Sequence, residues 1–260
     1  MDKYIARDSV RNSVVCDIEK SEYEEMEKFY EKYKWFENLM VSYQNYLISY
    51  NGYANYYKNI TDNEAHDDLQ DIQDDVTFML TSSITFSRMF IDNTKNFIKM
   101  AELRNVGTFN RIINEPDMKL IKALRDYATH FSIPIRSTEK TIDIVKEVTS
   151  FKFYIAKDDL LENDGNKQNT KVIQFFDGDD VNVHKLITEN NKNIHEIAEL
   201  IVKKYIDAID NNVKEFLLEH KKNKRFANSY MKVDVVSGRI FPQEVVHMNP
   251  NVFAILMFNL

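Results

Sequence analysis

The sequence predicts a mainly α-helical protein, a bundle of long helices with a small β-hairpin insert and a C-terminal extension. Only 5 Gly and 4 Pro occur in 260 residues, too few for the many tight turns of a β-sandwich or barrel. Apolar residues recur at three- and four-residue steps over long stretches, which is typical of amphipathic helices. Because 43% of the residues are hydrophobic, the chain can bury a sizeable core.

The apolar spacing in the first part of the chain predicts long helices. Residues 18–58 have helical periodicity and are expected to form one or two helices, with Ser21 and Glu24 spaced as in a capping box. Asn51-Gly52 predicts a break or a C-cap within this stretch. An acidic segment, residues 62–75, suits a helix N-terminus and leads into a second long helix that ends near Ala101.

Shorter elements follow. Gly107 predicts a loop, and Pro116 predicts the start of a helix because proline suits the first turn. That helix should end by Ile133, since the residue before a proline is disfavoured in the helical region. Apolar and polar residues then alternate in parts of 148–176, which predicts a β-hairpin or two short strands.

The last third combines a helix with a tail. Residues 194–222 have the clearest single-helix pattern in the chain. Residues 228–260 alternate around Ser237-Gly238 and are expected to form a hairpin or to dock on another subunit. We therefore expect one helical domain over 1–225, with a strand-like insert at about 148–176, and a C-terminal extension over 226–260.

Composition excludes several classes of protein. Cys16 is the only cysteine, so an intrachain disulfide is impossible. The first residues lack the apolar core of a signal peptide, and no apolar run has the length of a membrane span. These features predict a cytoplasmic protein without a membrane partner. His66-Asp67-Asp68 is discounted as a metal site because no second histidine lies at helical spacing, and no cofactor is expected.

Charge is unevenly distributed along an acidic chain of net charge −7. Residues 1–94 carry 9 Lys or Arg and 18 Asp or Glu, whereas residues 95–146 carry 10 and 6. Non-specific nucleic-acid binding proteins are usually basic throughout, because neutralising phosphates supplies their affinity. A local basic segment on an acidic body is compatible with an enzyme that handles RNA briefly, and equally with a solvated helix face.

The basic segment contains Arg125 and His130, which together could cleave a phosphodiester without a metal. A neutral imidazole can take the proton of an RNA 2′-hydroxyl as this oxygen attacks the adjacent phosphorus. A guanidinium can stabilise the charge that develops on the phosphoryl oxygens. On a continuous helix, however, five residues turn about 500° and leave the two side chains roughly 140° apart. Either the helix ends near Thr129, or a second copy related by a twofold axis completes the site.

The string Leu124-Arg125-Asp126-Tyr127…His130…Ile133-Pro134-Ile135 resembles the signature of the HEPN superfamily (higher eukaryotes and prokaryotes nucleotide-binding). In that family of all-α domains, an arginine is followed after four to six residues by a histidine. The resemblance implies an HEPN-like bundle, and many members are metal-independent RNases of toxin–antitoxin or phage-defence systems that act as dimers. The specific match covers about a dozen residues. This chain has Asp126 where asparagine is commoner, and a carboxylate there would repel phosphate.

The resemblance implies roles for particular residues. His130 would be the general acid or base, Arg125 the phosphate stabiliser and Asp126 the supporting polar residue. Basic side chains would guide the RNA strand, namely Arg104, Arg111, Lys119, Lys122 and Arg136. The partners expected are RNA, a second copy of the chain, and an antitoxin or other protein. The alternative is a non-catalytic HEPN-like helical protein that binds RNA, nucleotide or a protein partner.

Overall fold

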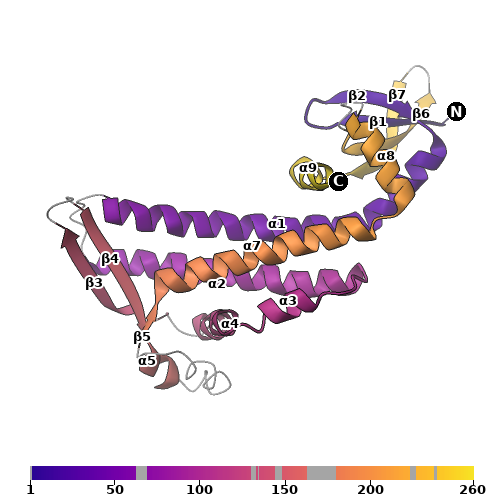
Figure 1. Ribbon diagram of the computed structural model, residues 1–260. Coiled ribbons are helices and arrows are strands. Elements are labelled where there is room, and N and C mark those ends of the chain that lie inside the picture. The colour runs from indigo at the N-terminus through magenta and orange to yellow at the C-terminus, as the bar shows by residue number, and fades with distance from the viewer. Residues whose placement is uncertain are drawn as a thin grey trace. The chain divides into compact units, whose positions relative to one another are not determined.

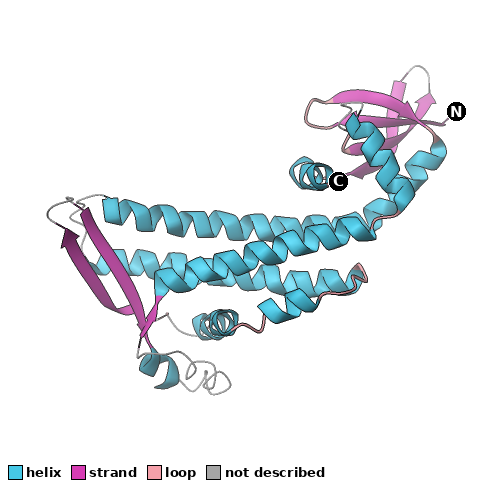
Figure 2. Cartoon of the chain, in the orientation of Figure 1, coloured by secondary structure: helices cyan, strands magenta, loops and turns pink. Residues whose placement is uncertain are grey.

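The computed structural model describes residues 2–62, 69–129, 133, 135–143, 148–162, 180–222, 227–236 and 239–260. Within these residues the protein is mainly helical, with eight helices and two small antiparallel sheets (Figures 1 and 2). The mainly α fold predicted from the sequence is confirmed. No helix in the described ranges combines the length and the apolarity needed to cross a membrane.

The chain forms two compact units whose segments alternate along the sequence. Unit 1 contains residues 1–41, 94–104 and 200–260, and unit 2 contains residues 42–93 and 105–199. The sequence pattern predicts instead one helical domain over 1–225 and an extension over 226–260. The observed segments are interleaved because strand β6 (Ser229–Val236) pairs with strand β1 (Asp2–Asp8), which joins the two ends of the chain.

Unit 1 contains a four-stranded antiparallel sheet of order β2-β1-β6-β7. Strand β2 spans Ser13–Ile18 and β7 spans Arg239–His247. The hairpin predicted in the tail is confirmed by the antiparallel pairing of β6 with β7. The unit also contains helix α9 (Pro250–Asn259), which Asn249 caps by accepting hydrogen bonds from the backbone of Asn251 and Val252.

Helix α1 spans Lys20–Asp62 and α2 spans Leu69–Met100, as the apolar spacing predicts. The break expected at Asn51-Gly52 was wrong, because α1 continues through both residues. A glycine within a helix costs only about 1 kcal/mol, and the next residue, Tyr53, is 1% exposed and packs in the core of unit 2. That packing offsets the cost of the glycine.

Helix α3 (Gly107–Ile112) begins at Gly107, so the loop predicted there lies before this residue rather than at it. Helix α4 (Pro116–Ala128) begins at the predicted proline and ends before Pro134, as expected. The single helix predicted over 194–222 was wrong. It is divided between α7 (Val183–Ala208) and α8 (Asn211–Lys222), because the carboxylate of Asp210 accepts a hydrogen bond from the backbone N–H of Asn212, at 2.9 Å, and caps a new helix.

The strand predicted around Phe151 is confirmed as β4 (Val148–Ala156). It pairs with β3 (Ile135–Asp143) and β5 (Asp180–Asn182) in a three-stranded antiparallel sheet. The second strand expected near 172–176 lies outside the described residues. A short helix, α5 (Lys157–Glu162), follows β4.

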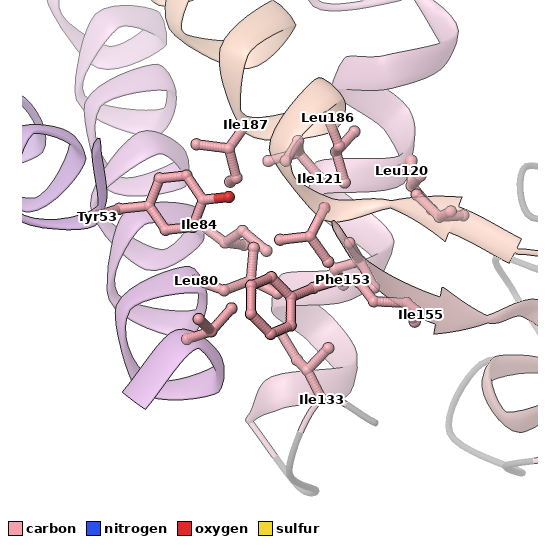
Figure 3. Packing of buried hydrophobic residues seen from close by; sticks show 14 of the residues in the cluster. Tyr53, Leu80, Ile84, Leu120, Ile121, Ile133, Phe153, Ile155, Leu186 and Ile187 are labelled. Carbon is pink, nitrogen blue, oxygen red and sulfur yellow. The ribbon is translucent and has the colours of Figure 1, made fainter. Parts of the chain in front are cut away.

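The sheet of unit 2 supplies one side of its hydrophobic core (Figure 3). Phe153 and Ile155 of β4 are fully buried and lie in one cluster with Leu80 of α2 and Ile121 of α4. Ile133, which follows α4, is 2% exposed and belongs to the same cluster. Both α4 and Ile133 therefore pack in the core, one before and one after position 130.

Candidate functional site

Arg125 lies in the last turn of α4, on the edge of the core of unit 2. Leu120, Ile121 and Leu124 of the same helix are buried and fix its rotation about its axis. Arg125 is half-buried, with 33% of its side chain exposed. A cation near a helix C-terminus is favoured by the helix dipole, so the position suits a guanidinium before any ligand is considered.

Two carboxylates hold Arg125. Its Nε lies 3.2 Å from Oδ1 of Asp126, the neighbouring residue on α4, and one Nη lies 4.0 Å from Oδ2 of Asp92 on α2. Asp126 is therefore an ion-pair partner of Arg125. It also places a negative charge beside the group that is expected to bind phosphate.

A second arginine, which lies outside the Arg125–His130 motif, joins this group. Arg88 of α2 has only 6% of its side chain exposed, and one Nη donates a hydrogen bond to Oδ1 of Asp92 at 3.3 Å. Burial lowers the pKa of Arg88 below its usual value, as does the nearby Arg125, while Asp92 raises it. The signal that could have revealed it is its register, because Arg88 is four residues after Ile84 and three before Ile91, in the core-facing positions of α2.

We call these four residues, Arg88, Asp92, Arg125 and Asp126, the arginine–aspartate cluster. Its two positive and two negative charges balance. Among the described residues, the Nε groups of Arg88 and Arg125 are buried and lack a hydrogen-bond partner, although the Nε of Arg125 faces Asp126 as an ion pair. An unsatisfied buried donor such as the Nε of Arg88 is costly. The partly exposed guanidinium of Arg125 is the member of the cluster that suits an anion as ligand.

His130 lies outside the described residues. Helix α4 ends at Ala128, and Thr129 is its C-cap, with its hydroxyl donating to the backbone carbonyl of Asp126 at 2.7 Å. The separation of about 140° between the side chains of Arg125 and His130 assumes a regular helix through both residues. Helix α4 ends two residues before position 130.

The basic residues expected to guide RNA differ in their ion pairs and in the unit to which they belong. Lys119 and Lys122 are exposed on α4. Lys122 lies about 60° around the helix from Arg125, and Lys119 about 120°. Arg111 of α3 is engaged by two carboxylates, at 3.1 Å from Glu115 and 3.0 Å from Glu196. Arg104 is exposed but belongs to unit 1. The side chain of Arg136, in β3, lies outside the described residues.

No cluster of three or more His, Cys, Asp or Glu suitable for a metal ion occurs within the residues that the structure describes. The discounted segment His66-Asp67-Asp68 lies outside them. Comparison of the chain with protein-family models, with curated proteins and with solved structures found no match.

Proposed function

We propose that the protein is an HEPN-like, metal-independent endoribonuclease of a defence or toxin–antitoxin type of system. One observation carries the proposal: the partly exposed guanidinium of Arg125 lies next to a second guanidinium, Arg88, and both contact the carboxylate of Asp92. Such a paired arrangement is suited to the charge that accumulates on a phosphoryl group in its transition state.

The proposed reaction uses the 2′-hydroxyl of RNA as its own nucleophile. His130 takes the proton of this hydroxyl, the 2′-oxygen attacks the adjacent phosphorus, and the bond to the 5′-oxygen breaks. Arg125 binds the phosphoryl oxygens, while Arg88, which is nearly buried, acts behind it by positioning Asp92 and raising the local positive potential. The 5′-oxygen leaves with a proton, and the products are a 2′,3′-cyclic phosphate and a 5′-hydroxyl.

The proton for the leaving group needs an acid. In the proposed homodimer a second His130, related by a twofold axis, supplies it while the first acts as base. Lys119 and Lys122 would contact the RNA backbone beside the site, and the reaction would take place in the cytoplasm.

One observation favours the second candidate, a non-catalytic helical protein that binds RNA, nucleotide or a protein partner. Asp92 and Asp126 already balance the charges of Arg88 and Arg125. A charge-balanced cluster can exist purely to fix the packing of α2 against α4. The two candidates differ in whether the guanidinium of Arg125 binds the phosphoryl oxygens of RNA or only fixes that packing.

The experiment is RNA cleavage by the purified full-length chain in excess EDTA. We expect cyclic-phosphate products, no cleavage when a 2′-deoxy residue replaces the nucleotide at the scission site, and a loss of at least about 100-fold in His130→Ala and Arg125→Ala. His247→Ala is the matched control, since His247 is an exposed histidine on β7 of unit 1. Cleavage that persists in either variant would remove the nuclease proposal. Binding of RNA without any cleavage by the wild type would establish the second candidate.

A further inference from the structure

A groove of about 320 Å³ in unit 2 lies between α1 and α2, and we call it the α1–α2 groove. It is formed mostly by apolar and small side chains, which include Ile48, Ser49 and Gly52 of α1 with Phe78, Ser82 and Phe86 of α2. Ile48 is 72% exposed and Phe78 is 70% exposed. Two large apolar side chains thus project into solvent at the groove, as is typical of a surface that binds another protein.

The helix surfaces around the groove are uncharged. Residues 42–57 of α1 contain no Lys, Arg, Asp or Glu, and neither do residues 76–87 of α2, in a chain that is 29% charged. Depletion of charged residues with enrichment of aromatic residues and Met is typical of the core of a protein interface. The chain as a whole has a net charge of −7, so two copies repel each other over much of their surface. At this face they can meet without opposing like charges.

The packing of the chain itself does not require the glycine at position 52. Gly52 is exposed within α1, where glycine is less favourable than other residues. A Cβ added there would meet no heavy atom of the rest of the chain within 4 Å. A glycine at this position does leave the helix backbone open to close approach from outside.

We propose that the α1–α2 groove binds a second copy of this chain across a twofold axis, with Phe78 of each copy inserted over Gly52 of the other. A twofold interface uses the same surface twice, so that surface must be complementary to itself. This face meets the requirement, because Ile48 and Phe78 project from it while the groove at Gly52 is hollow.

The area of this face suits a weak dimer. Residues 42–57 extend about 24 Å along α1, and two adjacent helices are about 20–24 Å wide, so the face covers roughly 500 Å² per copy. The two copies together would bury about 1,000 Å², the lower limit for a specific interface. We therefore expect a dissociation constant of about 1–100 μM.

The groove faces away from the arginine–aspartate cluster. Ser82 and Phe86 lie about 120° and 160° around α2 from Arg88. The proposed contact therefore differs from the one that would bring two His130 side chains together in the nuclease, and a chain that uses both contacts assembles beyond a dimer. RNA cleavage is not needed to test it.

The first test is sedimentation of the full-length protein from about 1 to 200 μM, a range that spans the expected dissociation constant. Gly52→Gln places a long uncharged side chain in the groove and should weaken this association at least about 10-fold. Its urea midpoint should equal or exceed that of the wild type, because glutamine favours a helix more than glycine does. Gly107→Gln is the matched control, since Gly107 is also exposed and also has no atom within 4 Å of an added Cβ.

Phe78→Ser removes the inserted side chain and should weaken the association by a similar factor. Phe258→Ser is its control, at a phenylalanine of unit 1 that is also exposed. The proposal is overturned if Gly52→Gln and Phe78→Ser have the mass of the wild type at every concentration. That result is also the one expected if the groove serves a different protein.

A mixing experiment tests the twofold geometry. Gly52→Lys and Phe78→Glu should each associate at least about 10-fold more weakly than the wild type, because each places two charges in the apolar contact. In an equimolar mixture the new lysine of one variant faces the new glutamate of the other, and the second contact keeps its native residues. Association should therefore return in the mixture. A mixture that associates no better than its two components would contradict the twofold arrangement, and Gly107→Lys mixed with Phe78→Glu is the control that should not associate.

Discussion

Two polar clusters in unit 2 start from adjacent residues of α2 and differ in kind. Ser87 belongs to a group that we call the neutral polar layer, formed with Tyr46, Asn190 and Asn191, whereas Arg88 belongs to the arginine–aspartate cluster. Ser87 donates to Oδ1 of Asn190 at 3.0 Å, Nδ2 of Asn190 donates to the hydroxyl of Tyr46 at 3.4 Å, and that hydroxyl donates to Asn191 at 3.3 Å. This layer links α1, α2 and α7 without any formal charge.

The arginine–aspartate cluster instead carries four charges, and among the described residues the buried Nε of Arg88 has no hydrogen-bond partner. Buried polar groups that serve only the fold are normally paired, as in the neutral polar layer. The difference teaches that polarity alone does not mark a binding site in this bundle. The informative features are formal charge and partial exposure, and these coincide at Arg125.

The largest effect on the free energy of unfolding is expected in the neutral polar layer. Asn190 is fully buried, so Asn190→Ala leaves Ser87 without its acceptor and opens a small cavity. We expect a loss of about 2–3 kcal/mol, measured by urea denaturation. Asn193→Ala on the same helix, at a partly exposed position, is the control and should change stability by less than about 0.5 kcal/mol. An equal loss in both variants would show that the layer has no special role.

A smaller effect on stability but a clear effect on activity is expected for Arg125→Lys. Lysine keeps the charge but presents a single ammonium instead of a planar fork. We expect cleavage to fall by about 10- to 100-fold, with stability changed by less than about 1 kcal/mol because the side chain is partly exposed. Lys203→Arg, the opposite exchange at an exposed position of α7, should leave cleavage within about threefold. If Arg125→Lys cleaves as well as the wild type, cleavage does not use the planar guanidinium, and the arginine–aspartate cluster does not differ in function from the neutral polar layer.

Asp126→Asn tests the charge balance of the arginine–aspartate cluster. The change leaves a net charge of +1 and keeps the shape of the side chain, so RNA should bind about 3- to 10-fold more tightly at low salt, and less so at high salt. Asp71→Asn, at an exposed site on α2, is the control for charge alone. A filter-binding titration measures both. Weaker RNA binding in Asp126→Asn would indicate that the carboxylate only fixes the packing.

The smallest effect on the free energy of unfolding is expected for His184, at the start of α7. Its ring stacks on Tyr57 at 4.0 Å between centroids, and burial lowers its pKa below 6.5. The unfolded chain then binds a proton more readily than the folded one, so stability should be complete above about pH 6.5 and decrease as the pH falls. We expect a change below about 1 kcal/mol, reduced by solvent at this half-buried site. His184→Phe should remove this part of the pH dependence in urea unfolding curves measured from pH 7.5 to 5; an unchanged profile would contradict the assignment.

Much of the helical fold could be predicted from the sequence because amphipathic spacing is a local signal. Helix α4 could be placed from Pro116 and its apolar face, and α2 from its long periodicity. The division between α7 and α8 was missed because Ile209 continues the apolar spacing while the cap depends on Asp210. Strands β1 and β2 were not predicted. Their pairing is completed by β6, more than 200 residues later, and such a contact leaves no local pattern.

The candidate site could be predicted only in part. Arg125 and Asp126 were identified by their spacing to His130, and their contact with each other lies within the described residues. Asp92 and Arg88 could not be identified from the motif, because they come from another helix and meet Arg125 only after α2 packs against α4. A charged residue in a core-facing register, as at Arg88, is the signal that a search of the sequence can use.

The alternation of the two compact units along α1, α2 and α7 limits how this molecule can be dissected. Each of these helices begins in one unit and ends in the other. No single cut in the chain therefore releases either unit as a continuous fragment, and a truncation aimed at one of them severs helices that both require. Binding and activity have to be assigned through point variants of the intact polypeptide.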